Sequence, residues 1–481
     1  MPKTITIHRE KAVGAAIDKC VHFGFCTAVC PTYVLDAEEN DSPRGRIALA
    51  KEMLAAGGKP KEETILHLDR CLSCLSCETT CAANVPYREI IDGAREYIEA
   101  SGARPWTQRV FRTVLAKTLT TPGLLSMANS LARLMPKNMA NMPGPVGALA
   151  ALSRAPAVAA LRTREGGELS EAATQEGSAD GKAHGAMARA GAPAADETGT
   201  NPPKTARRVG LLNGCVQSVL GGEINAAALR LLARAGISVI ELDKGQCCGA
   251  LELHMGKRSA GAKKSAGLVR EVSRMLAAGE IEAVVTTTSG CNSVIQHFDE
   301  VLADNPELRA EAERVKAATH DICVFALELD LPATGAANGA RVSYHDACSM
   351  THGLKLTRQP RQLFKQLNFD QRNIAEAHLC CGSAGVYNIL QPEISARLGK
   401  RKADNASIGD PDVIAAGNLG CLVQISRFTP VPVAHTVQLL DWATGGPPPR
   451  GLEGFQPRAL PEPEPAFEAA APAQESEEAF W

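Results

Sequence analysis

Seven cysteines near the start of the chain form two runs whose spacing suits iron–sulfur chemistry. The second run is complete, with two-residue gaps between its first three cysteines and a three-residue gap before its fourth. The short gaps let one loop place three thiolates on one cubane, and the longer gap sends the fourth thiolate to another cluster. A zinc site built from two Cys-x-x-Cys pairs is the alternative interpretation. The run consists of Cys71, Cys74, Cys77 and Cys81.

The first run is incomplete, because a phenylalanine stands where a ligand is expected. It contains Cys20, Cys26 and Cys30, with Phe23 at the second ligand position. Since the last cysteine of each run ligates the cluster of the other run, Cys30 is assigned to the cluster of the second run. The first cluster is then left with three thiolates.

Three thiolates predict a [3Fe–4S] cluster, or a [4Fe–4S] cluster with a labile or non-cysteine-ligated iron. His22 is the nearest candidate for such a ligand, and an ordinary loop histidine is the alternative. The predicted ligands of this first cluster are Cys20, Cys26 and Cys81. The predicted ligands of the second, a full [4Fe–4S] cluster, are Cys30, Cys71, Cys74 and Cys77.

Residues 41–46 (DSPRGR) lie between the two runs. Pro43 is suited to the first turn of a helix. Arg44 and Arg46 would then lie near anionic clusters and raise their reduction potentials. A surface turn with solvated arginines is the alternative interpretation.

Two further sets of four cysteines follow in a repeated arrangement. In each set, a single cysteine precedes a Cys-Cys-Gly triplet at the same separation, and one more cysteine follows. This match indicates an internal repeat. Gly249 and Gly382 would permit the turn that adjacent cysteines need to reach one cluster. The first set is Cys215, Cys247, Cys248 and Cys291, and the second is Cys348, Cys380, Cys381 and Cys421.

Three interpretations of these two sets stay open. Four thiolates suffice for a further [4Fe–4S] cluster in at least one unit. A scaffold with a thiol–disulfide pair and purely structural buried cysteines are the alternatives. His345 and His352 flank Cys348 and could bind a metal ion with it, as could His378 beside the second triplet, or they could serve as hydrogen-bond partners. Cys323 has no counterpart in the repeat and is predicted to lie in a core.

Short aliphatic segments lead into the cysteines of both sets. Strands are expected from Arg208, Ile237 and Ala283, and at 341–345 and 412–416, with a helix at 222–235. Strands that alternate with helices predict a parallel sheet, whose carboxyl edge is where such sheets bind ligands. The four cysteines of each set are therefore expected to meet at one point.

The length of 481 residues predicts a multidomain chain. The expected fold is an α-helical ferredoxin domain followed by two Rossmann-like α/β repeats. The six expected segments are the ferredoxin domain with two Fe–S clusters (1–102), a helical bridge (103–163), a flexible linker (164–206), the first α/β unit (207–335), the second (336–444) and a disordered tail (445–481).

Composition and charge narrow the class of protein. A net charge of -2 gives no indication of nucleic-acid binding. The start of the chain has no apolar segment typical of a signal peptide, so we expect a cytoplasmic location, where clustered cysteines bind metal or do redox chemistry. Amphipathic helices expected at 107–119 and 123–135 either pack on the cluster domain or contact the inner face of the plasma membrane peripherally.

With these motifs in order over most of residues 17–440, the chain resembles the iron–sulfur subunit of glycolate oxidase. Units with the Cys-Cys-Gly triplet alone are shared by heterodisulfide reductase-like subunits, a subunit of anaerobic glycerol-3-phosphate dehydrogenase and lactate-utilisation proteins. The matching segments are CVHFGFCTAVCPTY, SPRGRI, HLDRCLSCLSCETTC, NGC, CCGA, SGC, HLCCGSAGVY and GNLGC.

The resemblance implies an accessory electron carrier. FAD-binding partner subunits would oxidise glycolate or D-lactate to glyoxylate or pyruvate, and this chain would pass the electrons towards a membrane quinone or another acceptor. No catalytic residue is assigned here, because no G-x-G-x-x-G motif follows an expected strand. The alternative is a disulfide reductase-like carrier, but Val294 and Gln424 replace the last cysteine that its motifs carry. Phe23 and the long linker are departures from the family pattern.

Overall fold

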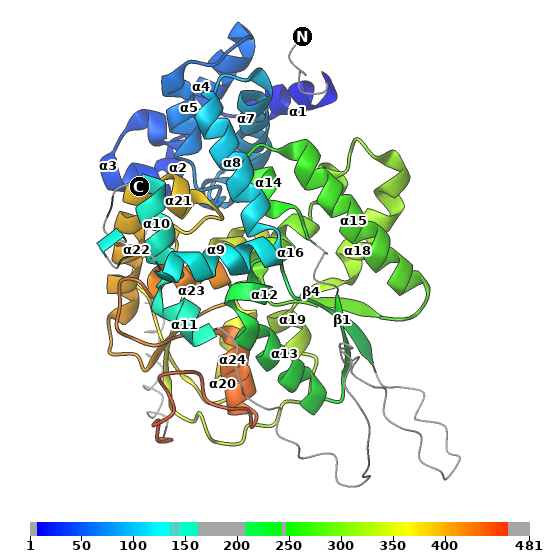
Figure 1. Cartoon of the computed structure of the whole chain (residues 1–481), viewed down its shortest axis with the longest axis vertical. Helices are drawn as coiled ribbons and strands as arrows, with labels where there is room; N and C mark the ends of the chain where they lie inside the picture. The colour runs from blue at the N-terminus through cyan, green and yellow to red at the C-terminus, as the bar shows by residue number, and fades with distance from the viewer. Residues whose placement is uncertain are drawn as a thin grey trace, which may run out of the picture.

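The computed structural model describes residues 7–134, 144–161, 207–242 and 247–459, together with residues 136, 138, 139 and 142. The predicted linker at 164–206 and most of the predicted tail lie outside the described residues. The N-terminal helices lie at one end of the molecule, above both α/β units (Figure 1).

The N-terminal part is a small helical bundle whose loops carry the two cysteine runs. Its core lies where α1, α4, α5 and α7 meet, and Gly93 lets α7 approach α1, since a Cβ there would lie 2.4 Å from Val13 Cγ2. The helices are α1 (Ile7–Asp18), α2 (Phe25–Ala28), α3 (Pro31–Asp36), η1 (Glu39–Asp41), α4 (Pro43–Ala56), α5 (Glu62–Asp69), α6 (Ser76–Thr79) and α7 (Tyr87–Ser101).

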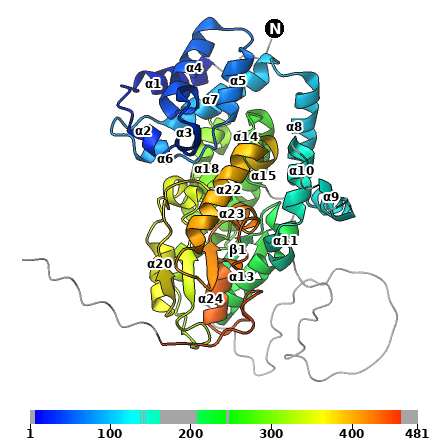
Figure 2. The same cartoon turned by 90° about the vertical axis from the view of Figure 1, so that its left-hand side faces the viewer.

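Four helices connect the bundle to the α/β units. Figure 2 shows them, in cyan, along one side of those units. The helices expected at 107–119 and 123–135 are confirmed, but packing on the cluster domain holds only for the start of α8, where Arg112 pairs with Glu99. Further along, Leu115 packs against Met255 and Ile389 of the two α/β units. These helices are α8 (Trp106–Leu119), α9 (Pro122–Leu134), α10 (Gly144–Ser153) and α11 (Pro156–Leu161).

Each α/β unit is built on a parallel four-stranded sheet, as the sequence predicts. The strand orders are β2-β1-β3-β4 and β6-β5-β7-β8, so the two sheets have the same topology. Their central strands are almost wholly buried, consistent with a parallel sheet covered by helices. The strands are β1 (Arg208–Leu212), β2 (Ser238–Leu242), β3 (Ala283–Thr286), β4 (Thr319–Asp321), β5 (Arg341–Tyr344), β6 (Asp370–Arg372), β7 (Val413–Ala416) and β8 (Val433–His435).

The helices of the first unit surround its sheet and reach across to the second unit. α13 packs on α24, and Arg230 of α13 lies 2.7 Å from the carboxylate of Asp441 on α24. One continuous core therefore extends through both units, and it includes the buried Cys323, as predicted. The first unit contains α12 (Gln217–Leu220), α13 (Gly222–Arg234), α14 (Ala250–His254), α15 (Arg258–Ala277), α16 (Ser289–Ile295), α17 (Phe298–Val301), η3 (Pro306–Leu308), α18 (Arg309–Ala318) and α19 (Ile322–Ala326).

The second unit repeats this arrangement with fewer helices. Its elements are η4 (Ser349–Gly353), α20 (Gln359–Gln366), α21 (Tyr387–Leu390), α22 (Pro392–Ser407), α23 (Leu419–Ile425) and α24 (Thr436–Ala443). In both units the cysteines follow strands at the carboxyl edge of the sheet, which faces the N-terminal bundle.

Candidate metal centres

The loop of the second run is tightly curled around its cysteines. Ser73 and Leu75 both have positive φ, at 52° and 62°, which residues other than glycine rarely adopt. The Ser73 N–H points back to Cys71 Sγ at 3.4 Å, and α6 begins directly after Leu75. Strained backbone of this kind persists only where the surrounding structure fixes it, and it is common at binding sites.

Cys30 lies near enough to the second run for its charge to act on Cys74 and Cys77, and its assignment as a ligand of this cluster stays a prediction. Burial raises the pKa of the Cys74 and Cys77 thiols well above the usual value, and charges on nearby cysteines, Cys30 and Cys71 among them, raise it further. Four thiols from two distant loops therefore come together at this point. Their chemistry fits a [4Fe–4S] cluster, because the cluster supplies the iron that makes buried thiolates tolerable.

Arg46 lies in this site, whereas Arg44 does not. The guanidinium of Arg46 is only 2% exposed, and it contacts Asp41 at 3.2 Å and Cys30 Sγ at 3.8 Å. Burial alone would lower the pKa of Arg46, but the charges of Cys71 and other neighbours outweigh burial and raise the pKa. Arg44 instead lies beside Cys26 of the first run, to which its backbone N–H is hydrogen-bonded, and its side chain pairs with Glu39. Pro43 begins α4, as expected.

The cysteines of the first run lie at the edge of the same core. Cys20, Cys26 and Cys81 are partly buried against it. Phe23, at the missing ligand position, is 66% exposed, and its ring lies 6.2 Å from that of Phe25. His22 is exposed and has a φ of 57°.

The four cysteines of the first α/β unit meet, as the repeat predicts. Cys215 Sγ lies 3.8 Å from Cys247 Sγ, and Cys248 lies within hydrogen-bonding reach of both Cys247 and Cys291. Hydrogen bonds with Cys215 and Cys248 lower the pKa of Cys247, and the Gly249 N–H contributes to the same effect.

The second unit has the same arrangement. Cys348 Sγ lies 4.0 Å from Cys380 Sγ, and Cys381 is hydrogen-bonded to both Cys380 and Cys421. Gly382 makes the required turn with a φ of 86°, and Gly249 does so in the first unit with a φ of 80°.

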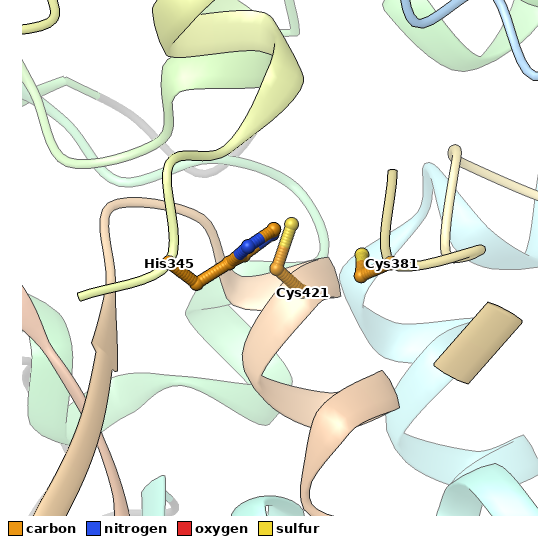
Figure 3. Close-up of side chains that lie close together, drawn as sticks. All are labelled: His345, Cys381 and Cys421. Carbon is orange, nitrogen blue, oxygen red and sulfur yellow. The ribbon is translucent and has the colours of Figure 1, made fainter. Parts of the chain in front are cut away.

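The three histidines near this site have different surroundings. Figure 3 shows His345 beside Cys421, with Cys381 on a neighbouring loop. Burial lowers the pKa of His345 well below its usual value. His352 instead lies 2.7 Å from Thr79 Oγ1 in the N-terminal bundle, and His378 is exposed. Among the described residues His345 groups with Cys381 and Cys421, and the alternative group of His345, Cys348 and His352 is not found.

One cavity of about 1400 Å³ connects the cysteine sets. Cys71 and Cys74 of the second run line it, together with all four cysteines of each α/β unit. Cys74 also packs in one apolar cluster with Cys348 and Cys380. The carboxyl edges of both sheets and the second cluster loop therefore enclose a shared space.

Two side chains that hold these parts together were not identified from the sequence. The Tyr387 hydroxyl donates to the Arg70 carbonyl at 3.0 Å, joining the second unit to the bundle. The Arg95 guanidinium donates to Ser73 Oγ at 2.6 Å and to the His254 carbonyl at 3.2 Å, joining the cluster loop to the first unit. Tyr387 ends the matching segment HLCCGSAGVY, which could have drawn attention to it, whereas Arg95 lies outside all the matching segments.

Family comparisons agree with this architecture. A 4Fe-4S dicluster domain matches residues 16–85, and a cysteine-rich domain matches twice, at 209–296 and 342–426. The dicluster domain implies two iron–sulfur clusters in the N-terminal region. A solved structure of a hypothetical protein from Helicobacter pylori aligns with 93% of this chain and 74% of its own, at 12% identity and a TM-score of 0.50, which supports the fold alone.

Several known proteins are similar to this chain. The glycolate oxidase iron-sulfur subunit of Escherichia coli is 29% identical over 88% of this chain and 93% of its own length. A probable glycolate oxidase iron-sulfur subunit of Bacillus subtilis is 28% identical over 87% and 90%. The lactate utilization protein A of Geobacillus kaustophilus is 25% identical but covers only 49% of this chain.

Within the described ranges, no helix is both long and apolar enough to cross a membrane. The chain thus combines one dicluster domain with two cysteine-rich domains and aligns over nearly the full length of the two subunits above. It is a homologue of the glycolate oxidase iron–sulfur subunits.

Proposed function

We propose that this chain is the electron-transfer subunit of a multisubunit glycolate oxidase or dehydrogenase. FAD-binding subunits would oxidise glycolate or D-lactate, and this chain would relay the electrons towards a membrane quinone. The observation that carries the proposal is the buried group of Cys30, Cys71, Cys74 and Cys77, which would hold a [4Fe–4S] cluster. Such a cluster, when bound, accepts and donates single electrons.

The protein surroundings of this group suit a redox site. Arg46 places a buried positive charge against Cys30, which favours the reduced, more negative state of a bound cluster. The Cys71 loop faces the cavity between the domains rather than bulk solvent. The charge of Arg46 would raise the reduction potential, whereas withdrawal from solvent would lower it by disfavouring the more negative, reduced state.

The first run offers a surface for a partner subunit. Val21, Phe23 and Phe25 are 58%, 66% and 62% exposed, so apolar side chains gather next to Cys20 and Cys26. Exposed apolar patches of this kind commonly mark protein contacts. We propose that the flavin subunits dock here. For peripheral membrane contact, the exposed Trp106, Val110 and Val114 of α8 are the candidates.

Anaerobic reduction with the partners tests the proposal. The chain is co-purified with its FAD-binding subunits, glycolate or D-lactate is added, and cluster reduction is followed by absorbance and electron paramagnetic resonance. We expect cluster reduction by one of these substrates in the wild type and its loss in Cys74→Ser. Cys323→Ser is the control and should still be reduced, because Cys323 lies in a core and belongs to none of the cysteine sets. Clusters that stay oxidised while the flavin is reduced would contradict electron transfer through this chain.

A second candidate function is reduction of a disulfide by the first α/β unit. It is favoured by the contact between Cys215 and Cys247 and by the lowered pKa of Cys247, which would make that sulfur a reactive thiolate. Val294 stands where the last motif cysteine is expected, which weakens this alternative. Cys247→Ser would abolish a disulfide reductase activity but leave reduction of the N-terminal clusters intact.

A further inference from the structure

His345 is a buried imidazole without a hydrogen-bond partner. It is 1% exposed, and neither Nδ1 nor Nε2 has a partner among the described residues. Buried polar atoms are nearly always paired, because losing water without a replacement is costly. An unpaired imidazole at the carboxyl edge of a sheet therefore indicates something that binds there.

Two buried thiols lie close to the imidazole of His345. One ring nitrogen of His345, Cys381 Sγ and Cys421 Sγ all lie within 4.8 Å of one another, and all three residues are buried. Figure 3 shows that they come from three separate segments: the end of β5, the Cys-Cys-Gly turn and the start of α23. Ligands on a single tetrahedral zinc ion, with bonds of about 2.0–2.3 Å, lie less than about 4.6 Å apart, so the three atoms could close on one ion with a small movement of their side chains.

The first unit lacks this nitrogen. When the two sequences are aligned on Cys215 and Cys348, Leu212 corresponds to His345. Each lies three residues before its cysteine. The two sites therefore share four thiols but differ in one ligand type. A lysine accompanies each site: the charge of Lys402 acts on Cys380 and Cys381, and that of Lys264 acts on Cys247 in the first unit.

We propose that the second unit binds a single divalent transition-metal ion of the zinc or ferrous class through His345, Cys381 and Cys421. Imidazole and thiolate together are the ligand set that these ions prefer. Cys348 and Cys380, at 4.0 Å from each other, are the nearest thiols that could complete the coordination. A divalent ion neutralises the charge of two thiolates. The positive charge of Lys402 would offset the charge of a third. The shared cavity, which Cys381 and Cys421 line, provides the route for the ion.

This site is distinct from the N-terminal clusters and does not rest on electron transfer. A cubane would require sulfide and would place each cysteine on a different iron. The proposed ion requires no sulfide and has a nitrogen ligand. The two kinds of centre can therefore be counted separately in one sample.

The test uses the full chain, purified anaerobically with its N-terminal clusters after growth with Zn²⁺ or Fe²⁺ supplied. Zinc, iron and acid-labile sulfide are measured per chain and the types of the N-terminal clusters are determined by electron paramagnetic resonance, so that zinc, or iron beyond the amount that these clusters contain, reports the single ion. X-ray absorption at the edge of that metal then counts nitrogen and sulfur ligands. The variants are His345→Leu, which installs the residue of the first unit, His345→Cys, and His378→Leu as the exposed control.

We expect one such ion in the wild type, with one nitrogen and the rest sulfur. His345→Leu should lower the affinity for the ion by more than the roughly 10–100-fold that follows the loss of a residue that only supports a ligand. His345→Cys should retain the ion with sulfur only, and His378→Leu should match the wild type. Unchanged signals of the N-terminal clusters show that the variants are folded. An ion retained by His345→Leu, or the lack of any metal beyond the clusters in wild type, overturns the proposal.

Discussion

At the scale of single residues, the two N-terminal cluster sites differ in how completely the protein supplies ligands. The second site has four buried or nearly buried thiols and a buried cation, Arg46, in contact with Cys30. The first has three partly buried cysteines and, at the remaining position, Phe23 pointing to solvent. The identity of one exposed side chain thus decides whether the first cluster has three or four protein ligands.

Replacement of Phe23 by cysteine tests this directly. We expect Phe23→Cys to convert a three-iron cluster into a four-iron cluster, removing the paramagnetic signal typical of oxidised [3Fe–4S] and adding one iron per chain. Stability should change by no more than about 0.5 kcal/mol, because the side chain is exposed.

Phe25→Cys is the matched control, since Phe25 is similarly exposed but lies outside the ligand spacing. It should leave iron content and the signal unchanged. A wild-type protein without the three-iron signal, together with unaltered iron in Phe23→Cys, would show that the first site already holds four irons.

At the scale of elements, the repeated units use one backbone device to gather their cysteines. In each, a glycine with positive φ follows the cysteine pair and lets the next helix begin close to the long helix after it. A Cβ on Gly249 would lie 2.4 Å from the Gly261 carbonyl oxygen, and one on Gly382 would lie 2.7 Å from that of Ser395. Backbone packed this closely holds both adjacent thiols at the carboxyl edge of the sheet.

Gly249→Ala should therefore be far more damaging than an alanine at a glycine that only needs its positive φ. Gly236 has a φ of 74° and open space around its Cβ position, so Gly236→Ala should cost only about 1–2 kcal/mol. Gly249→Ala adds a collision with backbone, worth about 1–3 kcal/mol more. Calorimetric melting of both full-length variants measures the difference. Equal shifts in Tm would mean that the turn moves freely.

At the scale of the whole molecule, sequence patterns predict the parts better than their assembly. Repeated spacing and aliphatic segments correctly predicted parallel sheets and the meeting of four cysteines in each unit. β6 and β8 were not expected, because three-residue strands such as Asp-Gln-Arg carry no hydrophobic pattern. The approach of Cys74 to Cys348 depends on contacts such as Tyr387 with Arg70, which pair residues from distant segments without any periodic signal.

Arg95 is the side chain on which this assembly most depends. It is buried in α7, and its guanidinium donates to the carbonyls of Leu68 and Cys71, to Ser73 Oγ and, across the interface, to the His254 carbonyl. One residue thus ties the second cluster loop both to its own bundle and to the first α/β unit. Losing a charged donor leaves several buried acceptors unpaired, at about 1.5–3 kcal/mol for each strong hydrogen bond.

We therefore expect Arg95→Ala to loosen the cluster loop rather than to unfold the chain. Even the loss of one such bond, at about 1.5–3 kcal/mol, corresponds to at least roughly 10–100-fold more frequent opening of the loop. Bleaching of the cluster absorbance in air, or iron loss to a chelator, should accelerate by a similar factor. Arg109→Ala, an exposed position on α8, is the control and should bleach at the wild-type rate. Arg95→Lys keeps the charge but cannot reach all four acceptors at once. An intermediate bleaching rate for this variant would show that the bridging geometry protects the loop. A wild-type rate for both Arg95 variants would mean that other contacts of the interface protect the loop.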